Sequence, residues 1–175
     1  MKSGAGDARR NVTKTSTMKS TKLILLAGIF SATLGFSTSH ILAQENKKCP
    51  IMTDDDVDSE ETVDFEGVKV GLCCAKCGKM WAKNAKYYIK ASGDALPQFK
   101  GMEEKLGLDK IELLPQKFCP IKTTSLITPD SPTVEYKGEK VYFFDQRAAD
   151  KWKADPETNA KRAIAAGLLP QLDGK

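Results

Sequence analysis

Cysteine is the residue type in this chain best suited to chemistry. There are five cysteines: Cys49, Cys73, Cys74, Cys77 and Cys119. An odd number of cysteines cannot form only disulfides within one chain. At least one cysteine must therefore be a free thiol, form an intermolecular bridge or belong to a metal site. The single histidine, His40, precedes them all. A metal site formed by the part of the chain that follows His40 would therefore use sulfur and oxygen without imidazole, and a histidine base is excluded there.

The spacing of four of these cysteines favours a metal site. Cys74 and Cys77 form a Cys-x-x-Cys knuckle, which is typical of a tetrahedral ion held by thiolates. Cys73 and Cys77, four residues apart, would share one side of a helix that starts here, and the helix N-terminus favours thiolates. A hairpin would return the chain to Cys49. We predict ligation by Cys49, Cys73 and Cys77, with Cys74 as an extra ligand.

The ligand chemistry indicates the class of ion. Thiolates without imidazole favour Zn(II) or Cu(I). Met52, in Cys49-Pro50-Ile51-Met52, is a conceivable thioether ligand for copper, although a methionine is interpreted first as a core residue. Cys119 is interpreted as a buried remnant, with ligation across the two halves as its alternative.

Two alternatives to a metal stay open. Cys74-Ala75-Lys76-Cys77 at a helix start is also the arrangement of a thiol–disulfide redox protein. However, no βαβ pattern precedes it, and Cys73 would crowd the attacking sulfur. Two structural disulfides with one free cysteine would likewise stabilise a small exported module.

The first 43 residues are typical of a secretory signal peptide. Lys19 and Lys22 precede an apolar run from Leu23 to Phe36, and a cleavage site follows Ala43. The run is shorter than the roughly 20 residues of a membrane-spanning helix, so we expect no retained anchor. Translation could also start at Met18. We therefore expect an exported protein, periplasmic or extracellular.

The charge of +4 belongs to this leader. Residues 1–43 contain six basic residues and one acidic residue, which leaves 21 basic against 22 acidic residues in the remainder. No basic footprint for nucleic acid remains, and we expect no nucleic-acid partner. The sequence also lacks the residue sets of a hydrolase or a phosphoryl transferase.

A repeat organises the rest of the chain. Cys49-Pro50-Ile51 recurs 70 residues later as Cys119-Pro120-Ile121, and Trp81 recurs 71 residues later as Trp152. Leu-Pro-Gln occurs three times, at 96–98, 114–116 and 169–171, and we expect extended segments that pack against the hairpins. In the second copy, Phe144, Asp145 and Ala148 replace the clustered cysteines. We therefore predict that the second copy is degenerate and binds no metal.

The pattern predicts an α+β fold made of two tandem small units, each with a Cys-Pro turn, a β-hairpin and a helix. The first unit spans 44–91, a linker spans 92–117, and the second unit spans 118–175. Glycine at 67 and at 138 marks the hairpin turns, after polar loops at 53–61 and 125–132. Strand residues are expected at 141–144. Helices are expected at 78–91 and at 146–166, the latter broken at Pro156, with a short helix near 102–106.

The first unit resembles the TRASH/YHS group of small metal-binding domains. The resemblance lies in three successive features: Cys-Pro-Ile-Met, a hairpin, and Leu-Cys-Cys-Ala-Lys-Cys-Gly at the start of a helix. That group is similar to treble-clef zinc-binding folds and is linked to heavy-metal sensing, trafficking and resistance. The resemblance implies that Cys49, Cys73 and Cys77 are ligands, with Cys74 an additional sulfur. It covers residues 49–91, and more weakly 119–155. We therefore expect a non-catalytic protein of metal handling or buffering, whose second unit serves packing or contacts a protein partner.

Overall fold

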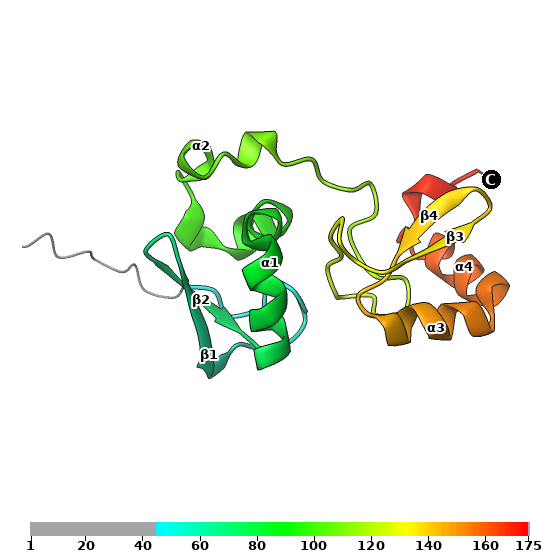
Figure 1. The fold of residues 1–175 in the computed structure, drawn as a ribbon, viewed down its shortest axis with the longest axis horizontal. Coiled ribbons are helices and arrows are strands. Elements are labelled where there is room, and N and C mark those ends of the chain that lie inside the picture. Colours follow the sequence, from blue (N-terminus) through cyan, green and yellow to red (C-terminus); the bar gives the residue numbers. More distant parts are fainter. Residues whose placement is uncertain (1–44, 175) are drawn as a thin grey trace, which may run out of the picture. The chain divides into compact units, whose positions relative to one another are not determined.

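The computed structural model describes residues 45–174, which all belong to one compact unit of the chain. The predicted signal peptide, residues 1–43, lies outside the described residues. Two antiparallel hairpins and several helices make up the fold, so the predicted α+β class is confirmed (Figure 1). Within residues 45–174, no helix has the length and apolar character needed to cross a bilayer.

The elements follow one another in the same order in both halves of the described chain. A hairpin of β1 (Asp58–Phe65) and β2 (Val68–Leu72) precedes α1 (Ala75–Ser92). After α2 (Glu103–Leu106), a hairpin of β3 (Thr133–Tyr136) and β4 (Glu139–Tyr142) precedes α3 (Gln146–Ala154) and α4 (Pro156–Ala165). Single 3-10 turns lie at Gly93–Ala95, Pro97–Phe99, Leu108–Lys110 and Pro170–Leu172.

Both hairpins close with the same turn. Glu66 and Gly67 have φ values of 54° and 80°, and Lys137 and Gly138 have 52° and 78°. Two successive residues with positive φ form a type I′ turn, whose twist matches that of the strands, and glycine tolerates this conformation best. The strand limits differ from the prediction: β1 begins inside the expected polar loop, at Asp58, and β4 ends at Tyr142 rather than at residue 144.

The helices also correspond. α1 begins at Ala75, three residues before the predicted start. Cys74 has an extended backbone and is the N-cap, so the helix begins at the next residue. Inside α1, Asn84 has non-helical angles (φ −137°, ψ 34°). The equivalent position in the second half is Asp155 (φ −154°, ψ 76°), which separates α3 from α4. Pro156 follows it as the first residue of α4, so the predicted break is confirmed.

Glutamine side chains hold the second strand of each hairpin. Gln98 donates to Asn46 Oδ1 (2.9 Å) and to the Lys69 carbonyl (3.3 Å). In the second half, Gln171 donates to Gln116 Oε1 (3.0 Å) and to the Lys140 carbonyl (3.1 Å). The Leu-Pro-Gln segments thus pack against the hairpins as expected. Two of them form 3-10 turns rather than the extended chain that the sequence predicted.

Each half has a tryptophan in its core. Trp81 stacks on Tyr88 at 6.2 Å between ring centroids, and Trp152 meets Tyr136 edge-on at 5.5 Å. Both indole N–H groups are buried without a hydrogen-bond partner. Because the orphaned donor occurs at the same place in both halves, it belongs to the shared fold rather than to a site in one of them. A common origin of the halves stays a prediction.

Hydrogen bonds join the two Cys-Pro loops. Thr53 N donates to the Thr124 carbonyl (2.9 Å), and Leu126 N donates to the Ile51 carbonyl (2.8 Å). A second connection is charged: Asp145 Oδ2 accepts from Lys76 Nζ (2.8 Å) and from Lys122 Nζ (2.9 Å). Although burial by itself raises the pKa of Asp145, these hydrogen bonds lower it well below its usual value.

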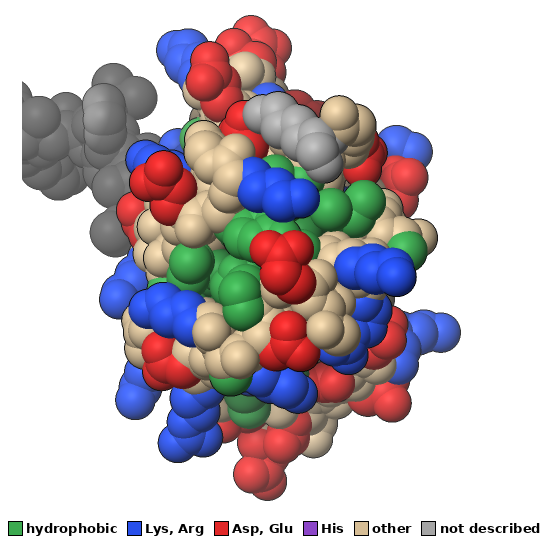
Figure 2. Space-filling model, turned by 90° about the vertical axis from the view of Figure 1, so that its right-hand side faces the viewer, with side chains coloured by type: hydrophobic (Ala, Val, Ile, Leu, Met, Phe, Trp, Pro, Cys, Tyr) green, Lys and Arg blue, Asp and Glu red, His purple; other side chains and the backbone are tan. Residues whose placement is uncertain are grey.

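Figure 2 shows the face of the molecule that lies on the right-hand side of Figure 1. On this face, Lys and Arg side chains are interspersed with Asp and Glu side chains around a smaller group of hydrophobic ones. The two signs of charge therefore alternate here, and no continuous basic surface forms on this face.

The Gln116 side chain should be a major source of stability in the second half. It is buried, donates to the Tyr142 carbonyl (2.7 Å) and accepts from Tyr142 N (3.0 Å). We expect Gln116→Ala to lower the free energy of unfolding by about 2 kcal/mol, because it leaves buried backbone groups unsatisfied. The half-buried Gln171→Ala is the control and should cost about half as much in urea denaturation. An equal or smaller loss in Gln116→Ala would contradict this role.

The Asp145 side chain should contribute to the free energy of unfolding in a pH-dependent way. Its side chain also caps α3 by accepting from Ala148 N (3.0 Å). Since folding lowers its pKa, the carboxylate stabilises the fold above the unfolded pKa of about 4, and the contribution is lost as the pH falls. Asp145→Asn keeps a capping group and should cost about 0.5–1 kcal/mol at pH 7, since both lysines are partly exposed. Asp145→Ala should cost about 1 kcal/mol more.

Urea denaturation of the Asp145 variants at several pH values checks this expectation. The gap in stability between the unsubstituted protein and Asp145→Asn should shrink as the pH falls from about 5 towards 3. A gap that is constant over this range would mean that the two lysine contacts contribute nothing measurable.

Candidate metal centre

Three cysteine sulfurs converge in the first half of the described chain. The Sγ atoms of Cys49, Cys73 and Cys77 all lie within 4.8 Å of one another, and Cys73 and Cys77 are 3.6 Å apart. With Zn–S bonds of about 2.3 Å, a tetrahedral ion separates its sulfurs by about 3.8 Å. Cys49 and Cys77 are buried, whereas Cys73 is half-buried. The three sulfurs therefore have the spacing of a metal site with one accessible side.

Backbone hydrogen bonds shape the loop that contributes Cys49. Cys49 N donates to the Asp55 carbonyl (2.9 Å), and Asp55 N donates to the Met52 carbonyl (2.9 Å). Met52 N points at the Cys49 sulfur, at 3.5 Å. The hydroxyl of Ser92, at the end of α1, donates to the Pro50 carbonyl (3.1 Å). The loop is thus closed on itself and attached to the helix that carries Cys77.

The other two sulfurs come from the junction of β2 and α1. Cys73 is the first residue after β2, and Cys77 lies in the first turn of α1, where its N–H donates to the Cys74 carbonyl (3.0 Å). The four-residue spacing therefore places both sulfurs on one side of this turn, as the sequence predicted. The hairpin returns the chain to the Cys49 loop: Asn46, just before that loop, bonds both the N–H and the carbonyl of Gly71.

The structure places Cys74 beside the cluster but not within it. Its Sγ lies 3.8 Å from that of Cys73, yet it is not among the sulfurs that share mutual distances within 4.8 Å. Cys74 occupies the N-cap position of α1, with an extended backbone. The cluster therefore contains three of the four predicted sulfur ligands.

Cys119 belongs to a different place in the fold. It is buried, and its sulfur accepts from Lys122 N at 3.3 Å, just as the Cys49 sulfur does from Met52 N. The positions equivalent to Cys73 and Cys77 hold Phe144 and Ala148, both buried. No group of metal-binding side chains forms around Cys119 among residues 45–174.

The three thiols of the cluster differ in pKa. A hydrogen bond from the Cys77 thiol lowers the pKa of Cys49 to about 5, and donating it raises the pKa of Cys77. Burial raises the pKa of Cys73 to about 12. Of the three thiols, Cys49 is therefore the one that loses its proton most readily. A bound ion would displace the remaining protons, because thiolates are the ligating form.

The distances between the thiols bear on the two alternatives to a metal site. All five cysteines are free thiols, and a separation of 3.6 Å is well beyond the roughly 2.05 Å of a disulfide bond. A redox pair would use Cys74 and Cys77 alone, whereas the structure also brings Cys49 and Cys73 to the Cys77 sulfur.

Met52, interpreted first as a core residue, packs against the core and lies beside the sulfur cluster. Its Sδ lies 3.9 Å from Cys73 Sγ, and its side chain is half-buried. The signal available in the sequence was the Cys-Pro-Ile-Met spacing, but a position three residues after a cysteine has no fixed direction until the loop is closed. Trp81, one turn after Cys77 on α1, packs among Phe65, Tyr88 and Phe99.

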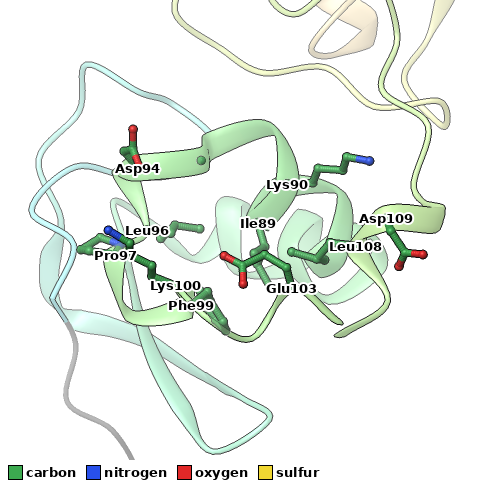
Figure 3. Close-up of a pocket in the computed structure, with 11 residues that line it drawn as sticks. Ile89, Lys90, Asp94, Leu96, Pro97, Phe99, Lys100, Glu103, Leu108 and Asp109 are labelled. Atoms are coloured by element: carbon green, nitrogen blue, oxygen red, sulfur yellow. The ribbon is translucent and has the colours of Figure 1, made fainter. Parts of the chain in front are cut away.

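A cavity of about 590 Å³ lies apart from the sulfurs (Figure 3). Its apolar lining comes from the end of α1 and the segment after it: Ile89, Leu96, Phe99 and Leu108. No cysteine lines it. A metal ion needs converging ligand atoms rather than a large cavity, so the sulfur cluster is the stronger candidate for function.

Comparison of the chain with protein-family models, with curated proteins and with solved structures finds no match in any of the three. The chemistry of the site must therefore be inferred from its own sulfurs and their surroundings.

Serine substitutions should distinguish the three clustered cysteines from Cys119 by their effect on metal affinity. We expect Cys49→Ser, Cys73→Ser and Cys77→Ser each to weaken soft-metal binding by more than about 100-fold, beyond the 10–100-fold typical of residues outside the ligand shell. Cys119→Ser is the matched control and should change affinity by less than about tenfold. Competition against a coloured chelator measures this. Loss of binding in Cys119→Ser equal to that in Cys49→Ser would refute the three-sulfur site.

Proposed function

We propose that the protein binds one soft metal ion, Zn(II) or Cu(I), and acts in metal handling or buffering without catalysis. The observation that carries this proposal is the convergence of three thiols from separate segments, Cys49 from a loop and Cys73 and Cys77 from a strand–helix junction. Within residues 45–174, no histidine, aspartate or glutamate joins this group. A donor set of sulfur alone favours soft ions.

The surroundings of the sulfurs suit reversible binding. Buried Cys49 and Cys77 would anchor the ion from the protein side, and half-buried Cys73 faces the accessible side. Cys74, 3.8 Å from Cys73 and half-buried, lies where a fourth thiolate could contact an arriving ion. This arrangement supports a buffer or a delivery protein rather than an enclosed structural site, because part of the donor set is only half-buried.

The resemblance to TRASH/YHS domains supports the same function, and we propose that residues 49–91 form such a domain. In an exported protein, the bound metal would also keep the thiols from oxidation. The second half, which lacks the sulfur pair, would serve packing: its loop at 124–126 holds the Cys49 loop through backbone hydrogen bonds. A protein partner for this half stays a prediction.

The test is elemental analysis combined with thiol counting on the exported protein. We expect one soft metal ion per chain, and release of this ion as a mercurial reagent titrates about three of the five thiols. Removing the metal should also lower the free energy of unfolding, by about 4 kcal/mol if free metal had stood at a thousand times Kd.

Two outcomes would reject the proposal. A reduced protein that takes up neither Zn(II) nor Cu(I) on titration would leave the sulfurs without a metal role. Turnover of insulin disulfides by the metal-free protein, lost in Cys74→Ser, would favour the redox alternative.

A further inference from the structure

The Met52 side chain reaches the sulfur cluster from a clamped backbone. Its Sδ lies 3.9 Å from Cys73 Sγ, and its N–H points at Cys49 Sγ at 3.5 Å. The neighbouring residues are hydrogen-bonded to the second half: the Ile51 carbonyl accepts from Leu126 N, and Thr53 N donates to the Thr124 carbonyl. Because the backbone is held on both sides, the thioether has a defined position beside two cysteine sulfurs.

The second half supplies an internal comparison for this position. Lys122 stands three residues after Cys119, as Met52 does after Cys49, and its N–H points at the Cys119 sulfur at 3.3 Å. Its ammonium contacts Asp145 (2.9 Å) and lies 4.8 Å from the centre of the Phe144 ring. Phe144 and Asp145 are the equivalents of Cys73 and Cys74. In both halves, therefore, this loop position directs its side chain to the same corner.

The donor set around the cluster has few other candidates for a fourth ligand. No carboxylate or imidazole of the described residues joins the three sulfurs. Cys74 Sγ is 3.8 Å from Cys73 Sγ but stands outside the mutual group. A thioether is a neutral, soft donor, which suits Cu(I) and adds little to Zn(II), whose fourth ligand is commonly a thiolate, imidazole, carboxylate or water.

We propose that Met52 Sδ is a ligand of the bound ion and that it makes the site prefer Cu(I) to Zn(II). This inference rests on the proposed soft-metal function and adds to it the fourth donor and the choice of ion. The site would then contain three thiolates and one thioether, with the thioether on the half-buried side, where the ion is loaded and released.

The test compares Met52→Leu with Met80→Leu. Both methionines are half-buried and packed against the core, but Met80 lies on α1, where it lines a small pocket with Tyr88 and Phe144. Affinities for Cu(I) and for Zn(II) are measured on the reduced full-length protein by competition with coloured chelators. We expect Met52→Leu to weaken Cu(I) binding by about tenfold or more and Zn(II) binding by less than about threefold, with neither affinity changed in Met80→Leu.

Selenomethionine labelling gives a second readout that does not depend on affinity. X-ray absorption at the selenium edge of the Cu(I)-loaded protein should show a copper neighbour of selenium, and Met52→Leu should remove it. Unchanged Cu(I) affinity in Met52→Leu, or equal losses for both ions, would overturn the inference while leaving the metal function intact. Selective loss of Cu(I) in Cys74→Ser instead would assign the fourth position to Cys74. Failure of the unsubstituted protein to bind either ion would reject the proposed function itself.

Discussion

The hydrogen bonds that hold the Cys49 loop are the constraint on which the site depends. Cys49 lies 24 residues before Cys73 in the sequence, and its sulfur meets the other two only because the loop is closed on itself and fixed to its neighbours. Part of that attachment comes from the second half, through Leu126 N and the Ile51 carbonyl. The half without the sulfur cluster thus contributes to the geometry of the half that has it.

The two halves show how one backbone can close around different interiors. Their hairpin turns, helix breaks and glutamine contacts correspond at matching positions. In the first half the corner contains sulfur. In the second half Phe144 fills the same corner, and the ammonium groups of Lys76 and Lys122 lie over its ring at 4.5 and 4.8 Å, paired with Asp145. Apolar bulk and cationic side chains thus occupy the corner where we propose that the first half holds a metal ion.

The proposed site has two buried sulfurs and an accessible side. Buried thiolates would give affinity, since they are desolvated and fixed before the ion arrives, whereas half-buried donors can exchange with a competing ligand. The same distinction separates a handling protein from a structural metal module, in which the ion is enclosed. Met52 and Cys74 both lie near Cys73, so the accessible side is itself rich in sulfur.

The order of the hairpins and helices and the three converging sulfurs could be predicted from residue types and spacing. Glycine at 67 and 138 required the turns, Pro156 required the helix break, and the four-residue spacing of Cys73 and Cys77 placed them on one side of a helical turn. The surroundings of the sulfurs are set by the tertiary structure. The position of Met52 depends on a loop clamped by residues about 70 positions away. Local spacing cannot encode this position, because contacts between segments distant in the chain set it.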